Sequence, residues 1–151
     1  MSVFYDTCDQ IAKVLRDSGR FGTIAIHVDR QRDFESELEK VVGQSVGNLI
    51  LVTWSGTDRG DRNATGPRFN GVFTITVWSK PIISGDDMAA DEVVQLVCQI
   101  LDDYRPLVNG RETHLQDRWV VQGAAILQHP SLLVHRIPVQ LPVQIPKLQT
   151  P

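Results

Sequence analysis

Histidine is the residue type in this chain best suited to metal or acid–base chemistry, but the spacing of its four copies assembles no site. His27 and His135 fall within expected strands, whereas His114 and His129 fall in expected connections. None of them forms HxH, HExxH or a pair at the helical spacing of metal ligands. Four separate structural or surface histidines are therefore expected, with no metal bound, although a fold can bring distant histidines together.

The chain also lacks the patterns of covalent catalysis and of phosphate binding. No GxSxG motif occurs, and neither Cys8 nor Cys98 has a neighbouring base in sequence to activate it. No P-loop or GxGxxG motif follows a strand, and Gly56, Gly60 and Gly66 are spaced for loop flexibility. We therefore expect no catalytic residue, no cofactor and no enzymatic activity.

Two pairs of adjacent carboxylates remain, and a structural role is the simpler interpretation of both. Asp86–Asp87 stands at the start of an expected helix, where the helix dipole stabilises acids, and Asp102–Asp103 stands at its other end beside Arg105. Catalytic or metal-binding acids are the less favoured alternative. The two cysteines are too few for a disulfide framework or a four-ligand zinc site, so we expect buried, reduced thiols.

The composition is that of one globular domain. The 151 residues are 42% hydrophobic and 22% charged, with a formal net charge of -3. This balance supports a core and gives no reason to expect a mainly electrostatic binder of nucleic acid or membrane. No run reaches the roughly 20 apolar residues of a membrane span. Asp6 and Asp9 stand where a signal peptide is cationic or apolar, so we expect a chain made in a cytosol.

Apolar residues at helical spacing predict three helices. The first spans Val3–Asp17, a short second one spans Asp33–Val42, and the third spans Met88–Tyr104. The third is the most amphipathic of them, and Pro106 is expected to end it.

Alternating or continuous apolar runs predict five strands. They are Thr23–Val28, Asn48–Ser55, Phe69–Ser79, Trp119–Gln128 and Leu132–Ile145. The order α-β-α-β-β-α-β-β contains no run of parallel crossovers. We therefore predict an α+β fold, a mostly antiparallel β-sheet with the two main helices packed on one face. Residues 1–146 are expected to form a single domain, and residues 147–151 a C-terminal tail.

Two segments are expected to find too few packing and pairing contacts within a single copy of the chain. Gly56–Pro67 is a polar, protruding arm with almost nothing to bury. In the last strand, prolines alternate with apolar residues. Because proline has no N–H, this strand is predicted to lie at an exposed edge or to leave the domain, with its apolar side on a partner surface. The candidate interface residues are Arg59, Asp61, Arg62, Arg68, Ile137, Val139, Leu141, Val143 and Ile145.

This order of elements resembles the tail terminator (tail completion) proteins of long-tailed bacteriophages and related prophages. The resemblance covers Val3 to about Ile145 and rests on the order and texture of the segments. Its main parts are NLILVTWSG with the arm that follows, GVFTITVWS, and the helix DEVVQLVCQILDDY before two closing strands. The stretch ITVWSK, followed by a break and then by that helix, carries most of the likeness.

The resemblance implies a structural subunit that assembles as a ring, usually hexameric, at the head-proximal end of the tail tube. Such a ring ends tube polymerisation and joins the tail to head-completion or connector proteins. It needs no catalysis, cofactor or membrane, and DNA passes through it without specific binding. The chain would be made in the host bacterial cytoplasm and would end in the virion, with the arm and the last strand as its candidate contacts.

Three alternatives stay open. One is another head–tail connector or minor tail protein, such as a head-closure protein. The second is a small soluble hydrolase or transferase whose acids or histidines meet only in the fold. The third is a soluble binding module that dimerises through the last strand. A polar pocket holding two or more histidines or acids would favour the enzyme, two-fold symmetry the dimer, and a ring the terminator.

Overall fold

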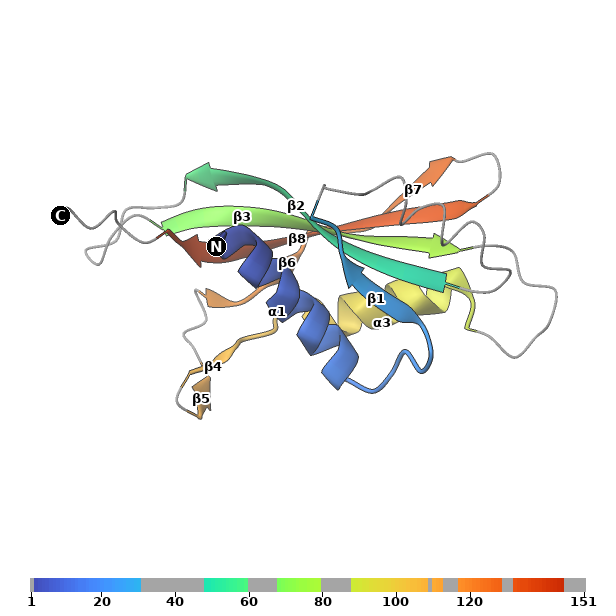
Figure 1. Ribbon diagram of the computed structural model, residues 1–151, viewed down its shortest axis with the longest axis horizontal. Coiled ribbons are helices and arrows are strands. Elements are labelled where there is room, and N and C mark those ends of the chain that lie inside the picture. Colours follow the sequence, from blue (N-terminus) through green and yellow to red (C-terminus); the bar gives the residue numbers. More distant parts are fainter. Residues whose placement is uncertain are drawn as a thin grey trace.

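A computed structural model describes residues 2–30, 48–59, 68–79, 88–108, 110–112, 117–128 and 132–145 (Figure 1). The predicted helix Asp33–Val42, residues 60–67 of the arm and residues 146–151 lie outside this part of the chain. The described helices and strands are α1 (Val3–Asp17), β1 (Ala25–Val28), β2 (Asn48–Arg59), β3 (Arg68–Ser79), α3 (Ala90–Leu101), β4 (Leu107–Val108), β5 (Arg111–Glu112), β6 (Val120–Val121), β7 (Ala125–Gln128) and β8 (Leu133–Gln144).

Six of the described strands form one sheet. They lie in the order β1-β2-β3-β8-β6, and β7 also pairs with β8. β1 and β2 run parallel, whereas the other pairs of this sheet are antiparallel. α1 and α3 pack on one face of the sheet (Figure 1). The predicted α+β class, with a mostly antiparallel sheet and two main helices on one face, is confirmed.

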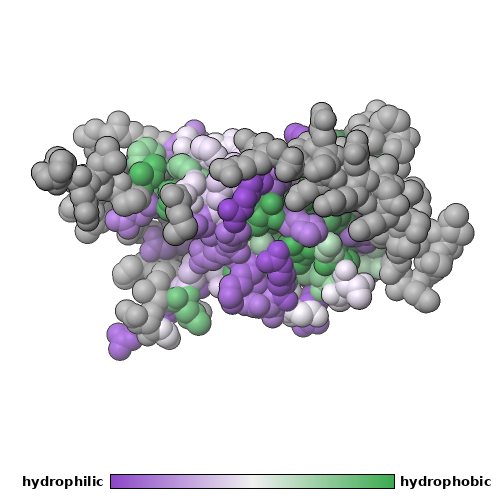
Figure 2. All heavy atoms as spheres, viewed as in Figure 1, coloured by the Kyte–Doolittle hydropathy of each residue, from purple (hydrophilic) through white to green (hydrophobic). Residues whose placement is uncertain are grey.

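The core lies between this face and the two helices. α1 contributes an apolar stripe at helical spacing, and Figure 2 shows polar side chains gathered over its outward side. The period of two along the strands turns alternate apolar residues toward the helices. The fully buried members from the three long strands are Ile50, Val52, Phe73, Ile75, Val77, Ile137 and Val139.

α1 has the bounds predicted for it, whereas α3 is shorter than predicted. Apolar periodicity continues to Tyr104, but the helix ends at Leu101 because the backbone turns at Asp103, whose φ is +59°. The following residues bond to a distant segment instead. The backbone N–H of Trp119 donates to the Tyr104 carbonyl at 2.8 Å, and the backbone N–H of Asp103 donates to the Trp119 carbonyl at 2.9 Å. A long-range pairing therefore ends the helix well before Pro106.

The pairing of β2 with β3 continues past the predicted end of β2. The predicted arm began at Gly56, yet residues up to Arg59 remain paired with β3, where Arg59 lies opposite Phe69. A bulge between Trp54 and Gly56 shifts the register, and Gly56 has a φ of +130° that favours glycine. The first four residues of the predicted arm are therefore strand.

β8 is an interior strand, which corrects the predicted exposed edge or departing arm. It pairs with β3 from Leu133 to Gln144 and with β6 and β7 on its other side. The Gln122 N–H donates to the Pro138 carbonyl at 2.8 Å, so even-numbered β8 residues turn their backbone groups toward β6 and β7. Pro138 lies between the two short strands, and Pro142 lies beyond β6. Each proline therefore stands where no N–H is needed.

The predicted strand Trp119–Gln128 is two short strands. β6 and β7 are separated by residues 122–124, and Gly123 has a φ of +119°. Glycine tolerates this conformation, which other residues rarely adopt. The pairing with β8 is therefore interrupted after β6 and resumes in β7, nearer the start of β8.

Candidate functional site

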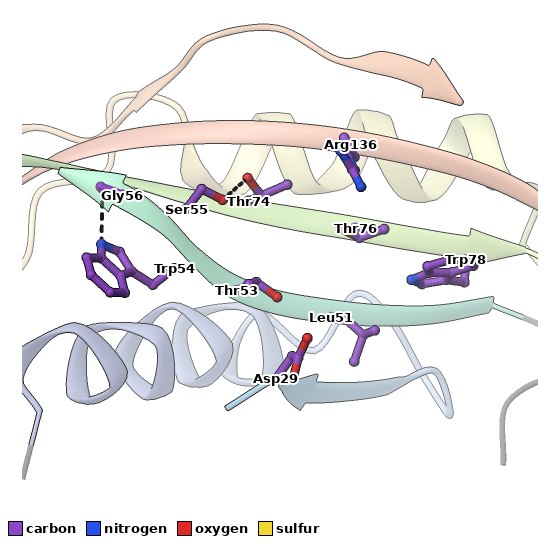
Figure 3. A pocket seen from close by; sticks show the side chains of 10 residues that line it. All are labelled: Asp29, Leu51, Thr53, Trp54, Ser55, Gly56, Thr74, Thr76, Trp78 and Arg136. Carbon is purple, nitrogen blue, oxygen red and sulfur yellow. Dashed lines mark hydrogen bonds between the residues drawn. The ribbon is translucent and has the colours of Figure 1, made fainter. Parts of the chain in front are cut away.

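The face of the sheet opposite α1 and α3 carries a cavity of about 670 Å³. Its floor follows from the register of the long strands, because residues opposite one another on neighbouring strands share a face. Leu51 lies opposite Thr76, and Thr76 lies opposite Arg136. Thr53 and Thr74 form the next row. Figure 3 shows these side chains rising from β2, β3 and β8 toward the same space.

The cavity lining is mixed, with hydroxyl groups beside the apolar side chains of Leu51, Trp54 and Trp78. The Ser55 and Thr74 hydroxyls lie 2.5 Å apart, so they share a hydrogen bond. Asp29, only 6% exposed, and the exposed Arg136 add one carboxylate and one guanidinium. This set can hydrogen-bond a polar surface or ligand. The described lining residues supply only one acid and no histidine, so they do not form the paired-acid or histidine pocket expected of the enzyme alternative.

Trp54 marks the border between this cavity and the helix layer. Its ring stacks on Phe4 of α1, with ring centroids 4.2 Å apart and planes inclined by 11°. Its indole N–H donates to the Gly56 carbonyl at 3.0 Å, across the bulge. The bulge thus fixes the Trp54 side chain against α1 and redirects the distal half of β2.

The histidines that the structure describes are not brought together. His27 is exposed and pairs with Leu51 on the cavity side of the sheet. His135 is half-buried and pairs with Val77, on the helix side. His114 and His129 lie outside the described residues. Within the described part of the chain, no cluster of three histidines, cysteines or acids that could hold a metal is found.

Both cysteines are free thiols; Cys8 is fully buried in the core, as predicted, whereas Cys98 is only half-buried against it. Burial raises the pKa of the Cys8 thiol to about 12, with a smaller contribution from Asp9. The pKa of Cys98 is also raised by burial and, to a lesser degree, by Asp102. A thiol that holds its proton is a poor nucleophile, so neither cysteine is set up for catalysis at neutral pH.

The described carboxylate pair, Asp102–Asp103, has structural partners. An oxygen of Asp102 accepts the Val121 N–H at 3.1 Å, which ties the end of α3 to β6. Asp103 lies 3.7 Å from Arg118 in an exposed ion pair. The other pair, Asp86–Asp87, lies outside the described residues.

Four of the predicted interface residues belong to the core. Ile137, Val139, Leu141 and Val143 are at most 4% exposed and pack under the helices of the same chain. The expectation that this side of the strand needs another chain was therefore wrong, because β8 lies inside the sheet. Ile145 is half-buried just past the end of β8.

Two of the charged candidates stand at the ends of described strands. Arg59 ends β2 and Arg68 begins β3, where they lie opposite Phe69 and Gln144 respectively. Asp61 and Arg62 lie outside the described residues.

Sequence reasoning missed an exposed apolar pair on the β7–β8 hairpin. The side chain of Ile126 is 70% exposed and that of Leu133 is 48% exposed. Ile126 lies opposite His135, two residues from Leu133 on β8, so the two are diagonal neighbours on one face. The signal was the uncharged run Ala125–Gln128 after Gly123, which lacks the charge or proline that usually guards an edge strand.

The fold and the surface thus define a small α+β protein with a hollow of mixed polarity on one sheet face and an exposed apolar edge. Compared with models of known protein families and with curated proteins, the chain matches none. Among the described helices, none is both long and apolar enough to cross a membrane.

Proposed function

We propose that this chain is a structural virion subunit of the tail-terminator type, which forms a ring at the head-proximal end of a phage tail tube. In this role it ends tube polymerisation, joins the tail to the head connector and carries out no reaction. The α+β fold agrees with what the resemblance implies. The proposal also accounts for surface features that a solitary chain does not need.

The observation that carries the proposal is the contrast between the two edge strands β1 and β7. A strand at an edge presents unpaired backbone groups that invite pairing with another chain. On the β1 side, Arg16 of α1 donates to the Ile26 carbonyl, and the Tyr5 hydroxyl donates to the Arg30 carbonyl at 3.3 Å. Arg30 also lies 3.0 Å from Asp9. α1 therefore holds this edge and the segment that follows it.

The β7 edge has no such cover among the described residues. β7 pairs with β8 on one side only, and Ile126 is its most exposed apolar side chain. An apolar, uncharged edge is an aggregation hazard in a monomer, but it is useful to a subunit that joins defined neighbours. This contrast favours an assembling protein.

Tube growth tests the function itself. A tail tube protein is polymerised with and without the chain, and tube lengths and ends are measured in negative-stain images. We expect shorter tubes that carry a ring at one end. Tubes of unchanged length with bare ends would contradict the terminator role, and a ring that binds the connector but leaves tube growth unchanged would favour a head-closure protein.

A further inference from the structure

The backbone of β7 offers hydrogen-bonding groups to a neighbour at alternate residues. Because even-numbered β8 residues face β7, Ala125 and Leu127, which lie opposite Arg136 and Val134, use their backbone groups within the hairpin. Ile126 and Gln128 turn theirs outward. Within the described part of the chain, no strand pairs with this outer side.

A second free edge lies on the opposite side of the same sheet. β1 covers β2 only opposite Leu49–Val52, so Thr53–Arg59 has no paired strand on its outer side among the described residues. The alternation along β2, corrected for the bulge, turns the backbone groups of Trp54, Thr57 and Arg59 outward.

The strand directions make these two edges compatible. β2 is antiparallel to β3, β3 to β8 and β8 to β7, so β7 runs opposite to β2. When a copy of the chain is rotated about an axis running roughly along the strands, its β7 therefore arrives antiparallel to β2 of its neighbour. We propose, on the basis of the ring in the proposed function, that β7 of each copy pairs antiparallel with the Thr53–Arg59 edge of the next copy.

The pairing is head-to-tail, as a ring requires. It joins two different edges, so every copy keeps one donor edge and one acceptor edge, and the contact repeats until the rotation closes. Along the strand direction, β7 lies near one end of the sheet and Thr53–Arg59 near the other, so neighbouring copies are offset along the strands. Closure then requires strands inclined to the ring axis, as in closed barrels.

Apolar burial favours the same arrangement. Ile126 lies opposite His135, which faces Val77 on the helix-covered side of the sheet. Trp54, stacked on Phe4 of α1, occupies that side at the free edge of β2. A sheet continued from copy to copy brings the exposed Ile126 side chain to the face where Trp54 is only half-buried.

Two proline substitutions test the contact from its two sides. Ile126→Pro and Thr57→Pro each remove one outward N–H that has no partner strand among the described residues of one copy. We expect each variant to keep the circular dichroism and unfolding midpoint of the wild type but to fall from ring to monomer in light scattering. The matched controls Ile126→Val and Thr57→Val keep the N–H and should keep the ring. Ile126→Lys provides a second disruption of the edge if the proline at that position impairs folding.

Mixing the two proline variants identifies the partner edge. In an equimolar mixture, the intact β7 of Thr57→Pro can pair with the intact β2 edge of Ile126→Pro. The two remaining edges of such a pair are both disrupted, so we expect dimers that cannot grow further. Loss of the ring in Ile126→Pro alone, with Thr57→Pro unaffected, would overturn the head-to-tail pairing and indicate that β7 pairs with itself. Rings from both proline variants would overturn the inference while leaving the proposed function intact. Absence of a ring in the wild type, with or without tail tubes, would remove both.

Discussion

At the scale of single residues, Cys8 shows how burial turns a reactive side chain into a core residue. Its side chain is fully buried, and its pKa is raised from 9.0 to about 12. The unfolded chain therefore loses the thiol proton at a lower pH than the folded chain does. The contribution of this group to stability is complete below pH 9.0 and is lost as the pH rises toward about 12.

This linkage predicts a pH-dependent difference between the wild type and Cys8→Ala. The variant is less stable at neutral pH because it leaves a cavity, but it lacks the loss caused by thiol ionisation. The gap in unfolding free energy should therefore narrow above pH 9.0, by at most about 1.4 kcal/mol per pH unit. Urea unfolding at several alkaline pH values measures it, with Cys98→Ala as the less buried control. A difference in unfolding free energy that stays constant with pH would contradict the raised pKa of Cys8.

At the scale of elements, the prolines of β8 show that backbone donors, rather than propensity, decide where a strand can lie. Pro138 and Pro142 share the parity that faces β6 and β7, at places where those strands are absent. The prolines therefore leave the ladder with β3 intact. The missing N–H of proline is compatible with an edge strand, but the second side of β8 is instead covered by two short, separated strands.

Two identical substitutions test this account. Gln140 and Gln144 have the same parity, but Gln140 lies opposite Val120 of β6, whereas Gln144 lies beyond it. Gln140→Pro should lower the free energy of unfolding by about 1–3 kcal/mol because it leaves a strand carbonyl without its donor. Gln144→Pro should change it by less than about 1 kcal/mol. Equal losses in urea unfolding would show that the ladder with β6 is not what limits proline in β8.

Local periodicity was sufficient for the elements that depend on their own sequence. It predicted α1 with both ends correct, and the apolar alternation in Phe69–Ser79 matches the burial of Phe73, Ile75 and Val77 in β3. It was insufficient where distant segments decide the outcome. The end of α3 depends on backbone bonds to Trp119, and the break between β6 and β7 depends on Gly123.

The candidate surface was the least predictable feature, because exposure follows from topology. A strand that alternates apolar residues with prolines looks the same in sequence whether it lies inside a sheet or at its edge, so the sequence alone assigns Ile137 and Val139 to an interface. Ile126 resembles an ordinary strand residue in sequence, and its exposure is evident only once β7 is placed at an edge of the sheet.

At the scale of the whole molecule, the two helices and the sheet divide their tasks. α1 and α3 cover one face of the sheet, and α1 also holds the β1 edge, so the described residues of a single copy already form a core. The distal half of β2 and the outer side of β7 are left open among the described residues. A subunit with its own core and with unpaired strand edges on two opposite sides is suited to assemble with copies of itself into a closed ring.

The most direct test of this central claim is the mass of the full chain in solution, measured by light scattering over a range of concentrations, alone and with tail tubes. The account predicts a single closed species several times the mass of one chain, about six times if the ring is hexameric, seen either alone or once tubes are present. A monomer or a two-fold dimer at every concentration, unchanged by tubes, would contradict it.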